Sequence, residues 1–469
     1  MQIINSVFLK KNSLKLLICF LSIVLSIKIF LFHQHYPGHD EIITFDRYLR
    51  WHTFLRRDAP NNHLLLSFIG TIINSIFGFN FYLLRFVAFL SLIGIFLIYS
   101  KLFKNFFVFT LFFVTIVSSE AIFNYSYLFR GYYLSSFISV IIYYYLYKYY
   151  FVKNKTKYIS IIFFLNFLLC IHALYTLYIW APVIIGLSIF LIKEKKIKIL
   201  IKNFFIYFLI PALIFYIIII TITGFSNEFS GNLNISFLYN NKISVIKRSL
   251  VPGIVAIFFD ENLSTTSFLS SFETRLLTIK DFFYLFYSHT IIFLILFFSF
   301  LLAIIKILFK KINVFDLITF IFIFIFIFFN KPLSGYYRVY ISFIYFFIFY
   351  IVHNLEVLLK YITFNKIFKN NLYHTIICLF ILTYFLETLE INTKYSQELK
   401  TSVKKINIHK NDCNEANDTL DQYQIWILIN FYPKNCYYYY DDNKKINILS
   451  NIKKNSNFKK KEISTLYFY

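Results

Sequence analysis

The side chains best suited to chemistry begin shortly after the first apolar stretch of the chain. Two adjacent carboxylates, Asp40 and Glu41, follow a Pro37–Gly38 turn and His39. A carboxylate can act as a general base when it comes within about 3 Å of the proton that it removes. Asp40 is therefore a candidate catalytic base, and Glu41 is a second one. The alternative is that Asp40 only caps the helix that follows.

Two arginines stand at the ends of apolar stretches, where they could bind an anion. Arg130 precedes Gly131 and Tyr132, and Arg338 precedes Val339. A guanidinium is costly beside lipid tails, but it can bind a phosphate with two parallel hydrogen bonds. Arg130 and Arg338 are therefore candidate phosphate-binding residues. The alternative for Arg130 is an extended side chain that reaches lipid head groups.

Other polar residues lie where the chain enters or leaves apolar stretches. Asn62 and His63 precede a run of leucines, and they could bind substrate or simply cap the next helix. His172 lies near Tyr175 at another such boundary. It could line the same cavity, or it could be a hydrogen-bonded residue of helix packing.

The segment after the first apolar stretch also holds five histidines, which are His33, His35, His39, His52 and His63. Imidazole and carboxylate groups suit zinc or manganese. The spacing of these histidines matches no specific ligand pattern, so the sequence predicts no required metal or other cofactor. Solvated or interfacial histidines are the default interpretation.

The composition predicts a membrane protein. The chain has 469 residues, of which 59% are hydrophobic and 15% charged, and its mean hydropathy is +0.65. This is too little polar surface to cover a water-soluble globule. The net charge of +24 resides mostly in short lysine clusters between apolar stretches, which is typical of topology-setting charge. We therefore predict no nucleic-acid partner.

The apolar windows predict an all-α polytopic membrane protein with about 11 to 13 transmembrane helices, each about 17 to 25 residues long. The stretch 63–100 contains Asn80 and Arg85 and could cross once or twice. The other predicted spans lie near residues 14–33, 105–123, 130–152, 157–175, 177–192, 203–223, 286–305, 314–330, 337–353 and 372–390.

The lysine clusters predict the topology, because cytoplasmic loops carry the positive charge. The N-terminus is then cytoplasmic, and the outside loops include 34–62 and 224–285. With Lys101 and Lys104 inside, the stretch 63–100 crosses an odd number of times, so one of its segments would be tilted, re-entrant or interfacial. The alternative is that this lysine pair is a local exception to the charge rule. We expect a transmembrane domain over 1–390 in the inner or plasma membrane and a polar extracytoplasmic tail over 391–469.

The local sequence also predicts two smaller elements. From Asp40 onward, apolar residues recur at roughly helical spacing, which predicts an amphipathic helix along the outer interface with Trp51 as an anchor. In the tail, Cys413 and Cys436 could form a disulfide if that tail is outside the cell. The tail is then a small domain closed by this bond.

The order of these motifs resembles the GT-C class of membrane glycosyltransferases, which includes protein O-mannosyltransferases and the aminoarabinose transferases of lipid A. The resemblance covers about the first 180 residues. It rests on the acidic pair after the first span, the polar re-entry at 61–64, the Leu84–Arg85 pair and the Arg-Gly-Tyr motif at 130–132. The Tyr337–Tyr340 segment is similar to a late family element, but Val339 intervenes and the usual proline is missing.

The resemblance implies an inverting transfer of a sugar from a polyprenyl-phosphate donor to a lipid, glycan or protein acceptor. Asp40 would take a proton from the acceptor, Arg130 and Arg338 would hold the donor phosphate, and Asn62, His63, Arg85, Tyr132 and His172 would contact substrate. A transporter or flippase of a lipid-linked saccharide is the alternative, and it would not need the acidic pair. A structural or assembly protein that acts through its tail is a third interpretation.

Overall fold

The computed structural model describes part of the chain, and several predicted features lie elsewhere. The predicted spans at 14–33, 105–123 and 372–390 are outside the described residues, as are Asp40, Asn62, Arg338 and Cys413. The described residues are 41, 44–45, 48–55, 63–102, 128–152, 155–223, 305–306, 313–329, 345–346, 349–350, 353–354, 436–440 and 446–450.

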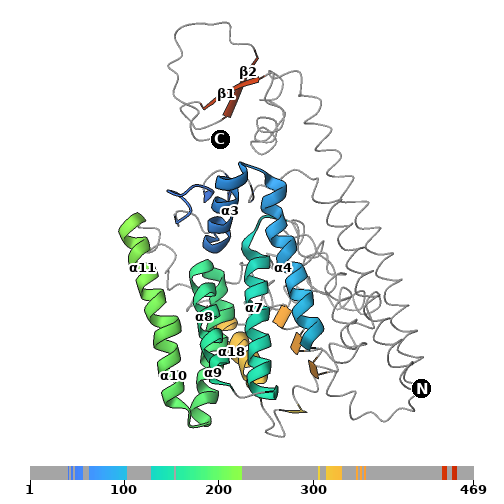
Figure 1. Cartoon of the computed structure of the whole chain (residues 1–469), viewed down its shortest axis with the longest axis vertical. Coiled ribbons are helices and arrows are strands. Elements are labelled where there is room, and N and C mark those ends of the chain that lie inside the picture. The colour runs from blue at the N-terminus through green and yellow to red at the C-terminus, as the bar shows by residue number, and fades with distance from the viewer. Residues whose placement is uncertain are drawn as a thin grey trace, which may run out of the picture.

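Up to residue 354, every described element of regular secondary structure is helical (Figure 1). Three π- or 3₁₀-helical turns interrupt or join these helices, namely η1 (Lys148–Val152), η2 (Leu174–Thr176) and η3 (Phe205–Leu209). The helices are α3 (Leu64–Phe77), α4 (Phe81–Leu102), α7 (Gly131–Tyr147), α8 (Thr156–His172), α9 (Leu177–Lys193), α10 (Ile197–Phe204), α11 (Ile210–Thr223) and α18 (Val314–Phe329).

The predicted spans in the described regions fall on these helices. The windows 130–152 and 203–223 correspond to α7 with η1 and to η3 with α11, and both include a π-helical turn. In the second case the turn precedes Pro211, which lacks an amide hydrogen and disturbs the regular hydrogen-bond ladder. Local backbone chemistry therefore explains this departure from a straight α-helix.

Two helices are long and apolar enough to cross a bilayer, Tyr82–Leu102 and Ile197–Thr221. In the second helix most side chains face outward, including Leu213 and Ile217, which are 53% and 62% exposed. Such an apolar outer surface suits lipid, not water. These two helices support membrane association, while the full number of spans stays a prediction.

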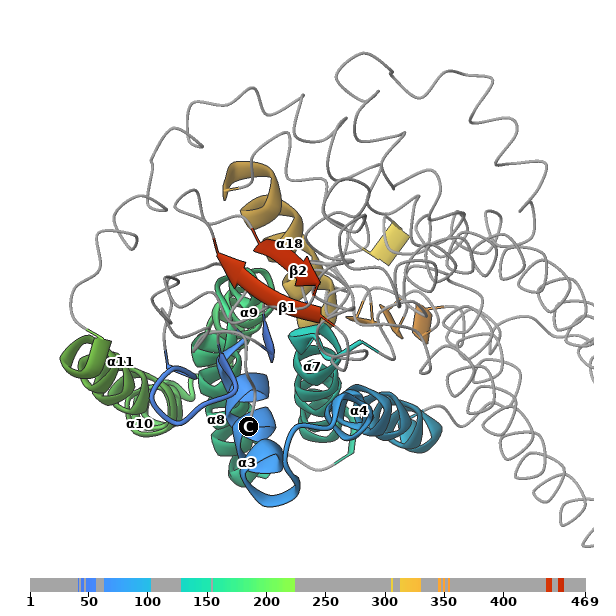
Figure 2. The same cartoon turned by 90° about the horizontal axis from the view of Figure 1, so that it is seen from above.

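The helices lie side by side in one bundle (Figures 1 and 2). Helix α7 packs against both α4 and α8, and α18 packs against α9. Two glycines permit close helix contacts: Gly94 faces the ring of Phe137, and Gly186 faces Ile318. Helix α7 therefore lies between α4 and α8, and its start positions most of the candidate site.

The two ends of the bundle differ in charge. The starts of α3 and α7 and the end of α8 meet at one end, which we call the site end. The opposite, lysine-rich end carries the turns between α7 and α8 and between α9 and α10, where Lys196 Nζ lies 3.1 Å from the Tyr149 hydroxyl. The lysine clusters predict that this second end is cytoplasmic.

The stretch 63–100 forms two unequal helices. Helix α3 has 14 residues and α4 has 22. They are joined by a turn at Gly78, whose φ of +72° lies in the region that glycine adopts without strain. At 1.5 Å per residue, α4 covers about 33 Å and α3 only about 21 Å.

The tail contains a two-stranded antiparallel sheet that was not predicted from the sequence. Strand β1 (Cys436–Tyr440) pairs with β2 (Ile446–Ser450), with Cys436 opposite Ser450 and Tyr440 opposite Ile446. The tyrosine run at 437–440 forms most of β1, because aromatic residues favour strands. The predicted disulfide is not tested, since Cys413 falls beyond the described part of the tail.

Candidate functional site

The first loop contributes a helical face that packs on the start of α7. Glu41, Thr44, Phe45 and Tyr48 are helical and almost completely buried. Their spacing of three and four residues places them on one face of a helix. The Phe45 ring stacks on the Phe129 ring, with centroids 5.7 Å apart. The predicted loop helix therefore turns two polar and two aromatic residues toward the bundle, but residues 49–55 form a bend and a turn and do not continue it.

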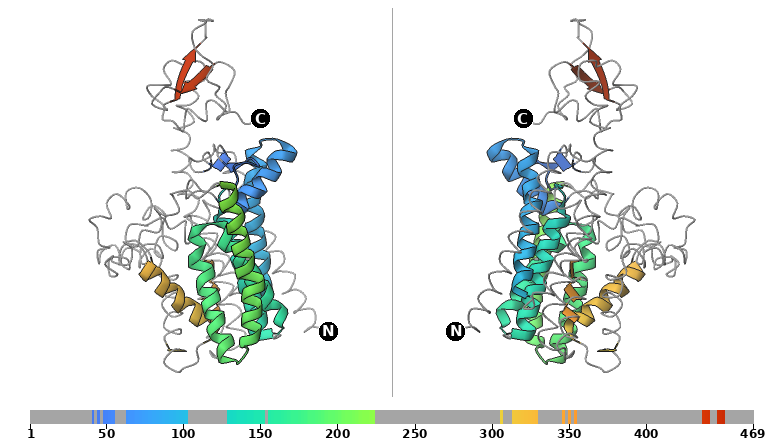
Figure 3. Two further views of the ribbon diagram at one scale, coloured as in Figure 1. Left: turned by 90° about the vertical axis from the view of Figure 1, so that its left-hand side faces the viewer. Right: turned by 90° about the vertical axis from the view of Figure 1, so that its right-hand side faces the viewer.

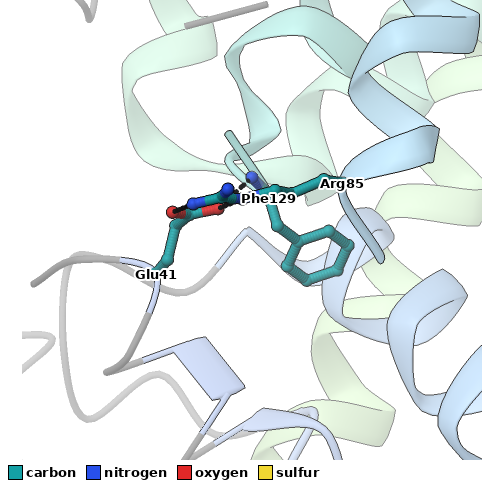
Figure 4. A network of polar contacts seen from close by, with 3 residues as sticks. All are labelled: Glu41, Arg85 and Phe129. Atoms are coloured by element: carbon teal, nitrogen blue, oxygen red, sulfur yellow. Dashed lines mark hydrogen bonds and ion pairs between the residues drawn. The ribbon is translucent and has the colours of Figure 1, made fainter. Parts of the chain in front are cut away.

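Glu41 forms a buried ion pair that joins three separate segments (Figure 4). Arg85 Nε donates to Glu41 Oε1 at 3.0 Å, and Arg85 Nη2 donates to Oε2 at 2.7 Å. The backbone amide of Phe129 also donates to Oε1, at 2.6 Å. This fork geometry is the strong form of a carboxylate–guanidinium contact. Glu41 thus holds the first loop, α4 and the residue before Arg130 together.

Arg130 precedes the first residue of α7 and is 2% exposed. Its Nη1 donates to Thr44 Oγ1 and its Nη2 to the Tyr132 hydroxyl, both at 3.4 Å. The guanidinium also lies 5.5 Å from the centroid of the Tyr132 ring. A positive side chain beside the first amides of a helix makes a favourable environment for an anion.

Gly131 brings two imidazole rings against the start of α7. An added Cβ at Gly131 would lie 2.5 Å from His172 Nε2 and 2.6 Å from His63 Cγ. His172 Nε2 donates to the carbonyl oxygen of Gly131 at 3.0 Å, because a carbonyl can only accept. The ring centroids of His63 and His172 are 5.6 Å apart. Only glycine permits this close approach.

Tyr175 completes the aromatic wall around His63. The ring centroids of His63 and Tyr175 are 5.6 Å apart, and those of Tyr132 and Tyr175 are 5.3 Å apart. Ser135 Oγ donates to the Tyr132 carbonyl, so the Tyr175 hydroxyl donates to Ser135 Oγ at 3.0 Å.

Six residues that the sequence singled out lie together at the site end, although they come from five separate segments. The group comprises Glu41, His63, Arg85, Arg130, Tyr132 and His172. Asp40, Asn62 and Arg338 belong to the same set of predictions, but the structure does not describe them. Their placement therefore stays untested.

Three contributors to this region were not among the predicted site residues. Thr44 contacts Arg130, and its position three residues after Glu41 was a usable signal. Tyr175 and Ser135 gave no comparable signal, because tyrosine is abundant throughout this chain and serine is common at helix ends. Within the described ranges, no group of three or more His, Cys, Asp or Glu residues lies close enough to hold a metal ion.

The site end thus combines the buried Glu41–Arg85 ion pair, the buried Arg130 guanidinium and an aromatic wall around His63. Such a combination can bind an anion next to a ring-shaped or apolar group. Comparisons with known protein families, with curated proteins and with solved structures find no match to this chain.

Proposed function

We propose that this chain is a membrane glycosyltransferase that uses a polyprenyl-phosphate-linked sugar as donor. The acceptor is a lipid, glycan or protein on the extracytoplasmic face, and the transfer inverts the configuration of the sugar. The observation that carries the proposal is the meeting of Glu41, Arg85 and Arg130 at the start of α7. These three residues were selected from sequence motifs that are far apart in the chain.

The chemistry assigned to Arg130 follows from its position. It is buried beside the first turn of α7, where amide hydrogens and a guanidinium both favour a phosphate. When the sugar leaves its carrier, the bond between the anomeric carbon and the phosphate oxygen breaks, and negative charge develops on that oxygen. Arg130 stabilises this charge, and Arg338 is a second candidate for the same role.

Asp40 is the proposed general base. It takes the proton from the acceptor hydroxyl or amine as that group attacks the anomeric carbon from the face opposite the phosphate. Glu41 is better suited to positioning, because both of its carboxylate oxygens already accept hydrogen bonds from Arg85. Its contact with the Phe129 amide fixes the backbone immediately before Arg130.

The proposed orientation follows from the charge distribution. The lysine-rich turns belong to the cytoplasmic end, so the site end faces away from the cytosol. Nucleotide-sugars are not expected on that side, and a lipid-linked donor fits it. The Lys196 and Glu194 side chains at the opposite end form an exposed ion pair of 2.6 Å, which is typical of a solvated turn.

The proposal is tested by Asp40→Asn, with Asp46→Asn in the same loop as the matched control. Cell-surface glycans are profiled by mass spectrometry in a deletion strain that carries the wild type or either variant. We expect Asp40→Asn to reproduce the deletion profile while its membrane level stays normal, and Asp46→Asn to restore the wild-type profile. A wild-type profile with Asp40→Asn would overturn the transferase assignment.

The same strains distinguish the alternative function. A transporter or flippase of a lipid-linked saccharide also needs a cation for the phosphate, but it needs no general base. Loss of the glycan with Arg130→Gln, combined with full activity of Asp40→Asn, would therefore indicate transport. Loss with both variants at normal membrane levels is the result that the transferase predicts.

A further inference from the structure

The turn between α3 and α4 carries a large apolar patch. Ile76 and Phe77 are each 67% exposed, the highest values among the large apolar side chains of the described residues. The turn projects past the start of α7 at the site end (Figures 1 and 3). We call the group made by Ile76, Phe77 and Tyr82 beside this turn the tip patch. Trp51 and Phe68, whose ring centroids lie 6.2 Å apart, are also exposed and lie where the first loop meets α3.

The surroundings of the tip patch are free of charge in the sequence. Residues 64–84 contain no Asp, Glu, Lys, Arg or His. The hydroxyls of Thr71 and Ser75 donate to carbonyl groups one turn earlier in α3, at 2.8 Å each. Polar groups that are satisfied inside their own helix suit an environment with little water. A patch that meets another soluble protein would instead have a polar rim.

The tip patch is continuous with the outer face of a candidate span. On α4, exposed side chains recur every three or four residues from Tyr82 through Phe86 and Leu90 to Leu97. These residues share one face of the helix. If α4 crosses the bilayer, this face meets the hydrocarbon, and the same surface leads past the Gly78 turn to Ile76 and Phe77.

We propose that the lipid bilayer covers the tip patch. Helix α3 then lies in the interface at the site end, and α4 is the one helix of 63–102 that crosses. The length of α3, about 21 Å, is short of the roughly 30 Å of hydrocarbon that a span must cover. Trp51 and Tyr82 are the residue types that anchor proteins at this depth.

This inference does not depend on the proposed reaction, but it bears on the site. Leu64, the first residue of α3, directly follows His63, and Gly70 in α3 contacts Leu49 of the first loop. A bilayer that holds the outer face of α3 therefore supports the inner face that packs on the site. The Trp51 indole, which donates to Ser75 Oγ at 3.0 Å, links the loop to the same helix.

The test is the depth of spin labels in the full-length protein. The five native cysteines are replaced, and single cysteines are introduced as Ile76→Cys, Phe77→Cys or Tyr82→Cys. Each labelled protein is reconstituted in phosphatidylcholine vesicles. Collision rates with oxygen, which partitions into lipid, and with a water-soluble nickel chelate give the depth. Leu90→Cys, on the exposed face of α4, and Lys195→Cys, in an exposed turn, are the matched controls.

We expect labels at 76 and 77 to collide more with oxygen than with nickel, at a depth of roughly 5–10 Å below the head groups. This depth lies between those of the labels at 90 and 195. A dominant nickel collision rate at both positions would overturn the proposal and indicate an aqueous patch. Exclusion of both reagents would overturn it as well, because a protein partner or a second copy of the chain would then cover the patch.

Discussion

The bundle buries a carboxylate at each of its two ends, and the two are held in different ways. Glu41 at the site end is neutralised by Arg85 and also accepts from the Phe129 amide. Asp316 at the lysine-rich end is held by hydrogen bonds, from the Asn313 amide at 2.8 Å and the Tyr350 hydroxyl at 2.5 Å. Both residues are 1% exposed.

Glu41 is held by residues far away in the sequence, whereas Asp316 is held mostly by a sequence neighbour. Asn313 and Asp316 exchange side-chain and backbone hydrogen bonds at the start of α18, which is a capping box. Among the described hydrogen-bond donors to Asp316, only Tyr350 comes from another segment, and the Lys306 ammonium adds a weaker electrostatic attraction. Glu41, by contrast, draws its partners from positions 44 and 88 residues away. The site end should therefore be more sensitive to single substitutions than the lysine-rich end.

The largest effect is expected for Arg85→Met. It leaves the Glu41 carboxylate buried without its guanidinium, and breaking such a pair costs about 3–5 kcal/mol. Thermal unfolding of the purified protein in detergent measures the loss. The double variant Glu41→Leu/Arg85→Met should recover part of it, because no buried charge then remains. A double variant that is less stable than Arg85→Met would contradict this account.

A smaller loss of stability is expected for Gly131→Ala, but with a large loss of function. The new methyl group would meet the rings of His63 and His172, and overpacking of this kind costs about 1–3 kcal/mol. Gly186→Ala is the matched control, because its Cβ would meet Ile318 at 2.8 Å, between α9 and α18.

The two glycine variants are compared by their thermal unfolding and by the glycan profile of complemented cells. Gly131→Ala should lose glycan product out of proportion to its stability, whereas Gly186→Ala should lose stability alone. Equal losses of product at equal stability would show that the start of α7 has no special role.

The smallest effect is expected at the lysine-rich end, for Asn313→Ala. The Asn313 side chain accepts from the amides of Phe315 and Asp316 at 2.9 and 3.0 Å. Loss of such a cap costs about 1 kcal/mol. Thermal unfolding should show this small decrease, and the glycan profile should stay that of the wild type. A loss as large as that of Arg85→Met would remove the distinction between the two ends.

The lengths of the apolar windows located most of the described helices, because a long apolar segment has few alternatives to a helix in a membrane. They also left the stretch 63–100 open between one crossing and two. The unequal lengths of α3 and α4, and the Gly78 turn between them, favour one crossing and one interfacial helix. The two strands of the tail were missed, because a run of tyrosines in a tyrosine-rich chain is a weak signal.

The candidate site could be predicted as a set of residues but not as a set of contacts. Glu41 and Arg85 were both singled out, yet their pairing was not, because a sequence pattern gives no distance between segments that are far apart in the chain. Thr44 gains its importance only from its contact with Arg130, and the reason for glycine at 131 in the Arg-Gly-Tyr motif appears only in the packing of His63 and His172. Arg130 lies beside Thr44 because the loop helix and α7 share the Phe45–Phe129 contact.

The sequence by itself predicted a lipid environment for this protein and placed polar candidate residues at the ends of its apolar windows, since both follow from composition and from the lengths of those windows. Only the tertiary structure decided which charges neutralise one another and which face the start of α7. The physical reason is that hydrophobicity can be read from a short stretch of sequence. An ion pair or a close approach at a glycine depends instead on how whole helices pack.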